Sequence, residues 1–146
     1  MCGIFGLVTL NNNKNFKKFI AELFKLSESR GKEASGVVFR SKKQIRYIKT
    51  PLPATKLIAS KSYNSELNLL LSQDSYNVAI GHSRLVTHGN ENNDENNQPV
   101  VAHDHILTHN GIIVNYKALW KSLKETTVSS LDSEVLLAII KDGILK

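Results

Sequence analysis

The spacing of hydrophobic residues in the first third of the chain predicts a strand, a helix and a strand pair. Ile4 to Leu10 is a short apolar run typical of a buried first strand. We expect the asparagines at 11–13 to form a turn and to cap a helix. Apolar residues then recur at helical spacing, at Phe16, Ile20, Leu23, Phe24 and Leu26. This helix should end at Arg30–Gly31, because glycine is a common helix terminator.

The middle of the chain predicts more strands and one short helix. Residues 35–40 and 44–49 have the β-branched and aromatic content of two strands, joined by a polar turn. Two prolines then break the pattern, since proline is poorly tolerated inside regular elements. A short helix around 67–71 and a strand at 78–82 are expected to follow.

The last third begins with a polar segment at 90–98, for which we expect a mobile surface loop. Residues 100–108 favour two short strands around a turn. One helix face is then marked by Tyr116, Leu119, Trp120 and Leu123, with Asn115 as its expected cap. Residues 135–140 are apolar on nearly every side, which is typical of a helix inside a larger structure.

Composition narrows the class of protein. A chain of 146 residues with 41% hydrophobic content fits one domain with a sizeable core. The net charge of +6 comes mainly from scattered lysines, without a basic patch interleaved with aromatics, so we expect no nucleic-acid partner. The single cysteine excludes an internal disulfide and suits a reducing compartment. We find no secretory signal and no apolar run that could span a bilayer, and we expect a cytoplasmic protein without a membrane partner.

The single cysteine, Cys2, is the first candidate for chemistry. If Met1 is removed, which the small cysteine side chain favours, Cys2 carries a thiol and a free α-amine together. Such an amine can act as the base for a nucleophile at the N-terminus. A lone cysteine is, however, more often a small buried hydrophobe. Cys2 alone therefore leaves both interpretations open.

Five further motifs accompany Cys2. In chain order the six are CGIFG (2–6), SRGKEASG (29–36), GHSRLVTHG (81–89), Gln98–Pro99, HNGII (109–113) and LDSEV (131–135). Together they resemble the class II glutamine amidotransferases. These are the N-terminal-nucleophile glutaminases of glutamine–fructose-6-phosphate amidotransferase, glutamine phosphoribosylpyrophosphate amidotransferase and asparagine synthetase. The resemblance runs from residue 2 to about residue 140 and is strongest to the fructose-6-phosphate branch.

The resemblance implies roles in catalysis for three residues. Cys2 would attack the side-chain amide carbon of glutamine while its α-amine shuttles the proton. The Asn110 side chain and the Gly111 backbone N–H would hold the resulting oxyanion, a contribution typically worth about 2.7–4 kcal/mol per donor. Taken alone, the pair Asn110–Gly111 also fits a type I′ hairpin turn.

The resemblance also implies residues that bind glutamine or support the nucleophile. Arg84 would grip the α-carboxylate, since its planar guanidinium can bond two oxygens. Asp132 would pair with the α-ammonium, although an acid at that place also suits a helix N-terminus. Thr87 and His88 would line the loop over glutamine. Arg30 would help to position the terminal cysteine, or is a surface cation near the end of a helix.

The implied fold is α+β, the N-terminal-nucleophile hydrolase αββα sandwich of two antiparallel sheets between helical layers. The implied reaction passes through a γ-glutamyl thioester on Cys2 and needs no metal or organic cofactor. Its ammonia would pass to a synthase or acceptor domain or subunit outside this chain. We expect residues 1–146 to form one glutaminase domain that is a fragment or split subunit without the family's last strands. Such a domain should expose an apolar sheet face and associate with itself or with a partner. Leu85 stands where the fructose-6-phosphate branch usually has an aromatic residue, and Glu33–Ala34 departs from the aspartate that is common in that loop of the family.

Three alternatives remain. Another N-terminal-nucleophile amide hydrolase would use Cys2 without needing Arg84 and Asp132. A non-catalytic, truncated glutamine-binding module would keep the fold without turnover. A metal site could form from His103, His105 and His109, of which the first two share one strand face, but no carboxylate or cysteine spacing supports it.

Overall fold

A computed structural model describes residues 1–10, 15–42, 44–72, 77–85, 96–102, 105–123, 127, 129 and 131–143. The helices are α1 (Phe16–Glu28), α2 (Ala54–Ala59), α3 (Lys61–Leu71), α4 (Tyr116–Ser122) and α5 (Glu134–Lys141). The strands are β1 (Gly3–Thr9), β2 (Ala34–Arg40), β3 (Ile45–Thr50), β4 (Asn77–Arg84), β5 (Val100–Ala102) and β6 (His105–Leu107). Within the described ranges, no helix has the length and apolar content needed to cross a membrane.

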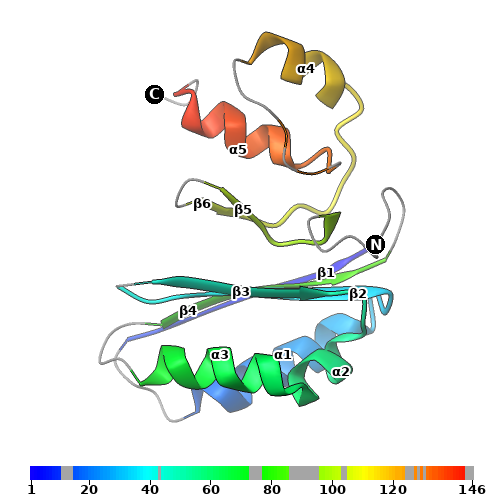
Figure 1. Cartoon of the computed structure of the whole chain (residues 1–146). Coiled ribbons are helices and arrows are strands. Elements are labelled where there is room, and N and C mark those ends of the chain that lie inside the picture. The colour runs from blue at the N-terminus through cyan, green and yellow to red at the C-terminus, as the bar shows by residue number, and fades with distance from the viewer. Residues whose placement is uncertain are drawn as a thin grey trace.

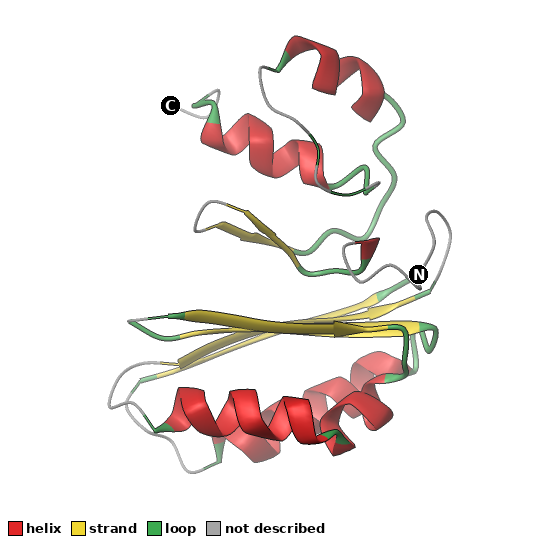
Figure 2. Cartoon of the chain, viewed as in Figure 1, coloured by secondary structure: helices red, strands yellow, loops and turns green. Residues whose placement is uncertain are grey.

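The elements lie in layers (Figure 1). One four-stranded antiparallel sheet has the order β1-β4-β2-β3, and α1, α2 and α3 cover one of its faces. The β5–β6 hairpin lies over the other face, with α5 and then α4 beyond it. Figure 2 shows the same arrangement by element type. The α+β class is confirmed.

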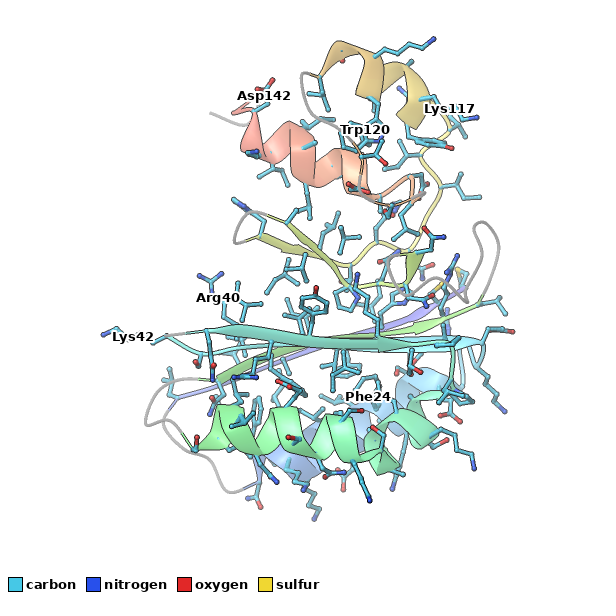
Figure 3. The ribbon with its side chains drawn as sticks, viewed as in Figure 1. Phe24, Arg40, Lys42, Lys117, Trp120 and Asp142 are labelled. Atoms are coloured by element: carbon cyan, nitrogen blue, oxygen red, sulfur yellow. The ribbon has the colours of Figure 1, made fainter. Side chains whose placement is uncertain are left out.

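The main core lies between the four-stranded sheet and the three helices. Aromatic rings form its centre: Phe5 of β1 packs edge-on against Phe24 of α1 at a centroid distance of 4.7 Å, and Tyr63 of α3 lies beside Phe24. Figure 3 labels Phe24 between the sheet and the helices. Burial raises the pKa of Tyr63. Strand alternation directs every second residue of β1 towards this core.

The other residues of β1 point away from the helices. Ile4 and Val8 are 43% and 65% exposed on this outer face. A small second cluster of Val100, Leu131 and Leu137 packs the β5–β6 hairpin against α5. Two apolar side chains of the edge strand β1 are therefore exposed on the outer face of the sheet.

Most of the predicted elements are confirmed with small changes at their ends, but α3 begins at Lys61, six residues before the helix expected at 67–71. The prediction missed α2, which begins directly after Pro53, a residue that fits a helix start. Asn115 does precede α4, but its side chain makes no capping hydrogen bond there. The proposed cap and turn at 11–13 lie outside the described residues.

Two local interpretations were wrong. The segment 90–98 was expected to be a surface loop. Residues 90–95 are not described, but Asn96, Asn97 and Gln98 are buried because they bond to neighbouring elements. Gly31 does not terminate α1, which ends at Glu28. A side chain at position 31 would instead collide with the backbone of β4 and the residue after it.

Candidate active site

Cys2 is joined to Asn110 by two hydrogen bonds, although 108 residues separate them in the chain. The backbone N–H of Cys2 donates to Oδ1 of Asn110 at 3.3 Å, and Nδ2 of Asn110 donates to the carbonyl oxygen of Cys2 at 3.1 Å. One amide side chain thus holds both backbone polar groups of the candidate nucleophile. The side-chain NH2 of Asn110 has two N–H donors. The bond to the Cys2 carbonyl uses one of them, and the second is left for another acceptor.

Strand pairing places Cys2 beside Arg84. Gly3 pairs with Ser83 in the β1–β4 ladder, so the preceding residue, Cys2, lies next to Arg84 on the same face of the sheet. The Cys2 sulfur meets the backbone of the following residue: Leu85 N lies 3.4 Å from Sγ, and Leu85 O lies 3.7 Å from it. The thiol is therefore held at the end of β4.

Asn110 and Gly111 lie in the connection between β6 and α4. They do not join two paired strands, so the hairpin-turn alternative is wrong. The connection is anchored through the residue before them: His109 N–H donates to Oε1 of Gln98 at 2.6 Å, and Nε2 of Gln98 donates to the His109 carbonyl at 2.9 Å. Nδ1 of His109 also lies 3.0 Å from Oγ of Ser133.

Arg84 is nearly buried and binds the segment before β5. Its Nη1 donates to the Asn96 carbonyl at 2.7 Å and to Oδ1 of Asn97 at 2.8 Å. This tethering role was not expected from the sequence. The role of Arg84 towards a ligand carboxylate stays a prediction.

Asp132 lies just before α5 and also holds the Asn110–Gly111 connection. Its Oδ2 accepts a hydrogen bond from the Ile113 N–H at 2.6 Å, and its Oδ1 accepts one from Oγ of Ser133 at 3.2 Å. Asp132 therefore ties the connection to the start of α5. Both functions foreseen for it, the ammonium contact and the helix-terminal acid, remain predictions.

His82 occupies the sheet two residues before Arg84. Its side chain is fully buried, and neither ring nitrogen has a hydrogen-bond partner in the described part of the chain. Burial, and secondly the charge of Arg84, lowers the pKa of His82 to about 4. The ring is consequently neutral at pH 7.

A cavity of about 520 Å³ brings most of the candidate residues together. Its lining includes Cys2, Arg84, Asn110, Gly111 and Asp132. This volume is within the range of small-molecule sites. The cavity lies between the end of the four-stranded sheet, which contributes Cys2 and Arg84, and the later segments, which contribute Asn110, Gly111 and Asp132.

The remaining candidates are placed elsewhere or not placed. Thr87 and His88 lie outside the described residues. Arg30 is exposed and borders a smaller groove of about 440 Å³, which also touches Cys2 and Asn110. Its positioning role stays a prediction.

The metal alternative concerned three histidines. His103 is outside the described residues, His105 is exposed on β6, and His109 bonds to Ser133 as given above. No group of three or more metal-ligating side chains is found among the residues that the structure describes.

Sequence reasoning assigned no role to Gln98 and treated Leu85 only as a missing aromatic. In the structure Gln98 fixes the backbone of His109, and the backbone of Leu85 contacts the Cys2 sulfur. The only sequence signal for the first was the motif pair Gln98–Pro99, and its peptide bond is cis. A backbone contact such as that of Leu85 leaves no side-chain signal.

The chain is similar to a known protein family and to several known proteins. A family model described as a glutamine amidotransferase domain matches residues 68–143. The chain is 28% identical, over 97% of its length, to glutamine–fructose-6-phosphate aminotransferase (isomerizing) of Listeria monocytogenes. It is 32% identical over its whole length to amidophosphoribosyltransferase of Methanocaldococcus jannaschii, and 28% identical over 93% to 7-cyano-7-deazaguanine synthase of Saccharolobus solfataricus.

These relatives are longer proteins. The chain spans 22% of the Listeria protein, 30% of the Methanocaldococcus protein and 29% of the Saccharolobus protein. The family model, in contrast, covers more than half of the chain and includes the Asn110–Gly111 and Asp132 motifs. On this match and on the relatives, the chain belongs to the class II glutamine amidotransferase family.

Proposed function

We propose that the chain hydrolyses the side-chain amide of L-glutamine through a γ-glutamyl thioester on Cys2. The observation that carries this proposal is the two-bond clamp between Cys2 and Asn110 at the edge of a cavity that also contains Arg84 and Asp132. The cavity thus holds a nucleophile and an amide donor side by side. The same cavity offers one cation and one carboxylate for the two charged groups of an amino acid.

The nucleophile requires removal of Met1, whose side chain is 74% exposed and borders the cavity. The nitrogen of Cys2 then becomes an α-amine, still within reach of Oδ1 of Asn110. This amine takes the thiol proton as sulfur attacks the amide carbon. Cys2 thus supplies both the nucleophile and its base.

The attack forms a tetrahedral oxyanion. A second N–H of Asn110 and the backbone N–H of Gly111 are the donors proposed for it. Collapse of this intermediate breaks the carbon–nitrogen bond, and the leaving nitrogen departs as ammonia with the proton held by the amine. Water then attacks the thioester, which yields glutamate and restores the thiol.

The substrate ends are assigned by charge. Arg84 is proposed to pair with the α-carboxylate and Asp132 with the α-ammonium. Both side chains already bond protein groups, which fixes their positions before a ligand arrives. Such fixed charges favour an amino acid over an uncharged amide.

The finer fold and the partner belong to the same proposal. The layers of helices, sheet, hairpin and helices support the N-terminal-nucleophile αββα arrangement. The relatives are named as transferases or a synthase and are several times longer than this chain. We therefore infer that ammonia passes to an acceptor domain or subunit.

The test is intact mass before and after treatment with a glutamine-mimicking diazoketone, which alkylates a glutamine-binding nucleophile. We expect loss of Met1 and a single adduct, and expect Cys2→Ala to abolish both the adduct and ammonia release from glutamine. Gly6→Ala is the matched control, because a Cβ at Gly6 meets nothing closer than 3.9 Å. Retention of Met1, or labelling that survives Cys2→Ala, would contradict the proposal. Faster hydrolysis of simple N-acyl amides than of glutamine would favour a different amide hydrolase.

A further inference from the structure

The peptide bond between Arg84 and Leu85 lies against the sulfur of Cys2. Its nitrogen is 3.4 Å from Sγ in a donor geometry, while the carbonyl of Leu85 is 3.7 Å away on the acceptor side. A neutral sulfur is a weak acceptor, but a thiolate carries a full charge, and hydrogen bonds to ionised groups are the stronger ones. The N–H of Leu85 therefore interacts more strongly with the ionised form of the sulfur than with the neutral form.

This peptide bond is held from behind by the segment after α1. A Cβ atom at Gly31 would come within 3.0 Å of the Arg84 carbonyl carbon and oxygen and of the Leu85 nitrogen, which real Cβ atoms do not tolerate. Gly31 is buried, and all three of these atoms are backbone atoms that cannot rotate away. Only glycine permits this approach.

A hydrogen bond fixes the same peptide at its carbonyl end. The N–H of Glu33 donates to the Arg84 carbonyl oxygen at 3.2 Å. The Arg84–Leu85 peptide plane is thus packed against Gly31 and bonded to Glu33. Its N–H is directed at the sulfur by contacts that do not involve any side chain of the cavity.

We propose that Gly31 is a positioning residue for the nucleophile, because it lets the Arg84–Leu85 peptide direct the Leu85 N–H at Cys2 Sγ and stabilise the thiolate. The contact is independent of what the cavity binds. Its use in catalysis rests on the function proposed above. The proposal assigns to the glycine of the Arg30–Gly31 pair a positioning role that the family resemblance implied for the arginine.

The first test measures alkylation of the thiol by iodoacetamide as a function of pH. The chain has one cysteine, so the adduct reports Cys2 alone. For Gly31→Ala we expect the midpoint of the rate–pH curve to rise by about one unit, since a hydrogen bond to a charged group is lost. At a fixed pH below the midpoint, the rate should fall only about threefold, because a more basic thiolate is a better nucleophile. Gly6→Ala should behave as the unchanged protein.

The second test removes the donor without touching Gly31. Replacing residue 85 by the α-hydroxy acid of leucine turns the amide N–H into an ester oxygen and keeps the side chain. We expect the same upward shift of the midpoint. If Gly31→Ala fails to melt cooperatively, this ester variant decides alone. A wild-type midpoint in the folded ester variant would overturn the proposal.

Neither readout requires glutamine. Failure of glutamine turnover with an intact midpoint shift would remove the proposed function and leave the sulfur contact standing. Normal turnover with a wild-type midpoint in the ester variant would do the reverse. The two proposals can therefore fail separately.

Discussion

The two sides of the cavity are stabilised in different ways. The helix-backed sheet, comprising the described residues up to 85, has a continuous core of twelve buried residues. The hairpin layer, comprising the described residues from 96 onward, has a cluster of three, and α4 buries no residue fully. We infer that the first region can hold its shape by apolar burial, whereas the second depends on polar bonds for its position.

Those polar bonds converge on the candidate site. The hairpin layer is joined to the sheet by the bonds of Asn110 to Cys2 and of Arg84 to residues 96 and 97. Within the layer, Gln98 and Asp132 fix the connection that carries Asn110. The residues proposed for catalysis thus also join the two regions. Loss of one such bond should disturb activity more than global stability.

The largest effect is expected in the helix-backed sheet. Phe24→Ala removes a fully buried ring that contacts Phe5 and Tyr63, and should lower the free energy of unfolding by about 3–5 kcal/mol. Chemical denaturation measures this change. Phe19→Ala is the matched control on the same helix, because Phe19 is 41% exposed. Equal losses in the two variants would contradict the conclusion that burial of Phe24 in the core stabilises the helix-backed sheet.

A pH effect of similar size on the free energy of unfolding is expected from His82, which lines the cavity on β4. His82 has a folded pKa of about 4 against an ordinary value of 6.5, so the unfolded chain binds the proton more readily between these values. The contribution of the neutral His82 ring to stability should be complete above pH 6.5. It should fall by on the order of 3 kcal/mol as the pH drops towards 4.

Denaturation curves at a series of pH values measure this dependence. In His82→Leu the contribution of this group should vanish, and the slope between pH 6.5 and 4 should become shallower. A slope unchanged by the substitution would show that other groups cause the acid sensitivity.

A smaller change in stability but a clear loss of activity is expected for Gln98→Leu. The substitution removes both bonds to the His109 backbone, which should cost about 1–3 kcal/mol and loosen the connection that carries Asn110. We expect ammonia release from glutamine to fall at least about tenfold, because small displacements of catalytic groups cost about that much or more.

The control is Gln44→Leu, because the Gln44 side chain accepts a hydrogen bond from Nε of Arg46 on β3 and does not line the cavity. Unfolding curves and turnover should be measured on the same preparations. Normal turnover in Gln98→Leu would show that catalysis does not need the bonds of Gln98 to the His109 backbone.

The smallest effect on stability is expected at the exposed face of β1. Val8→Lys adds a charge to an edge strand that is 65% exposed at this residue, and should change the free energy of unfolding by about 0.5 kcal/mol or less. Light scattering should nevertheless show less self-association, since charged residues protect sheet edges. Self-association unaffected by this substitution would point to another surface.

The motifs predicted much of this molecule because their local signals are strong. The apolar run at Ile4–Leu10 and the helical spacing after Phe16 correctly predicted the strand β1 and the helix α1. The motif containing Asn110 was also recognised from the sequence as part of the site. Local patterns failed where a segment is fixed by distant groups. Asn97 and Gln98 look like loop residues until Arg84 and His109 supply their partners.

The sequence by itself determined the family, the order of most elements and the identity of the candidate nucleophile. These follow from residue types and spacings that lie close together in the chain. Only the tertiary structure decided that Asn110 clamps Cys2, that Gly31 packs on the Arg84–Leu85 peptide, and that Asp132 holds the backbone of Ile113. The physical reason is that each of these contacts has a backbone atom as one partner and joins residues far apart in the chain, and a backbone atom is nearly the same in every residue type.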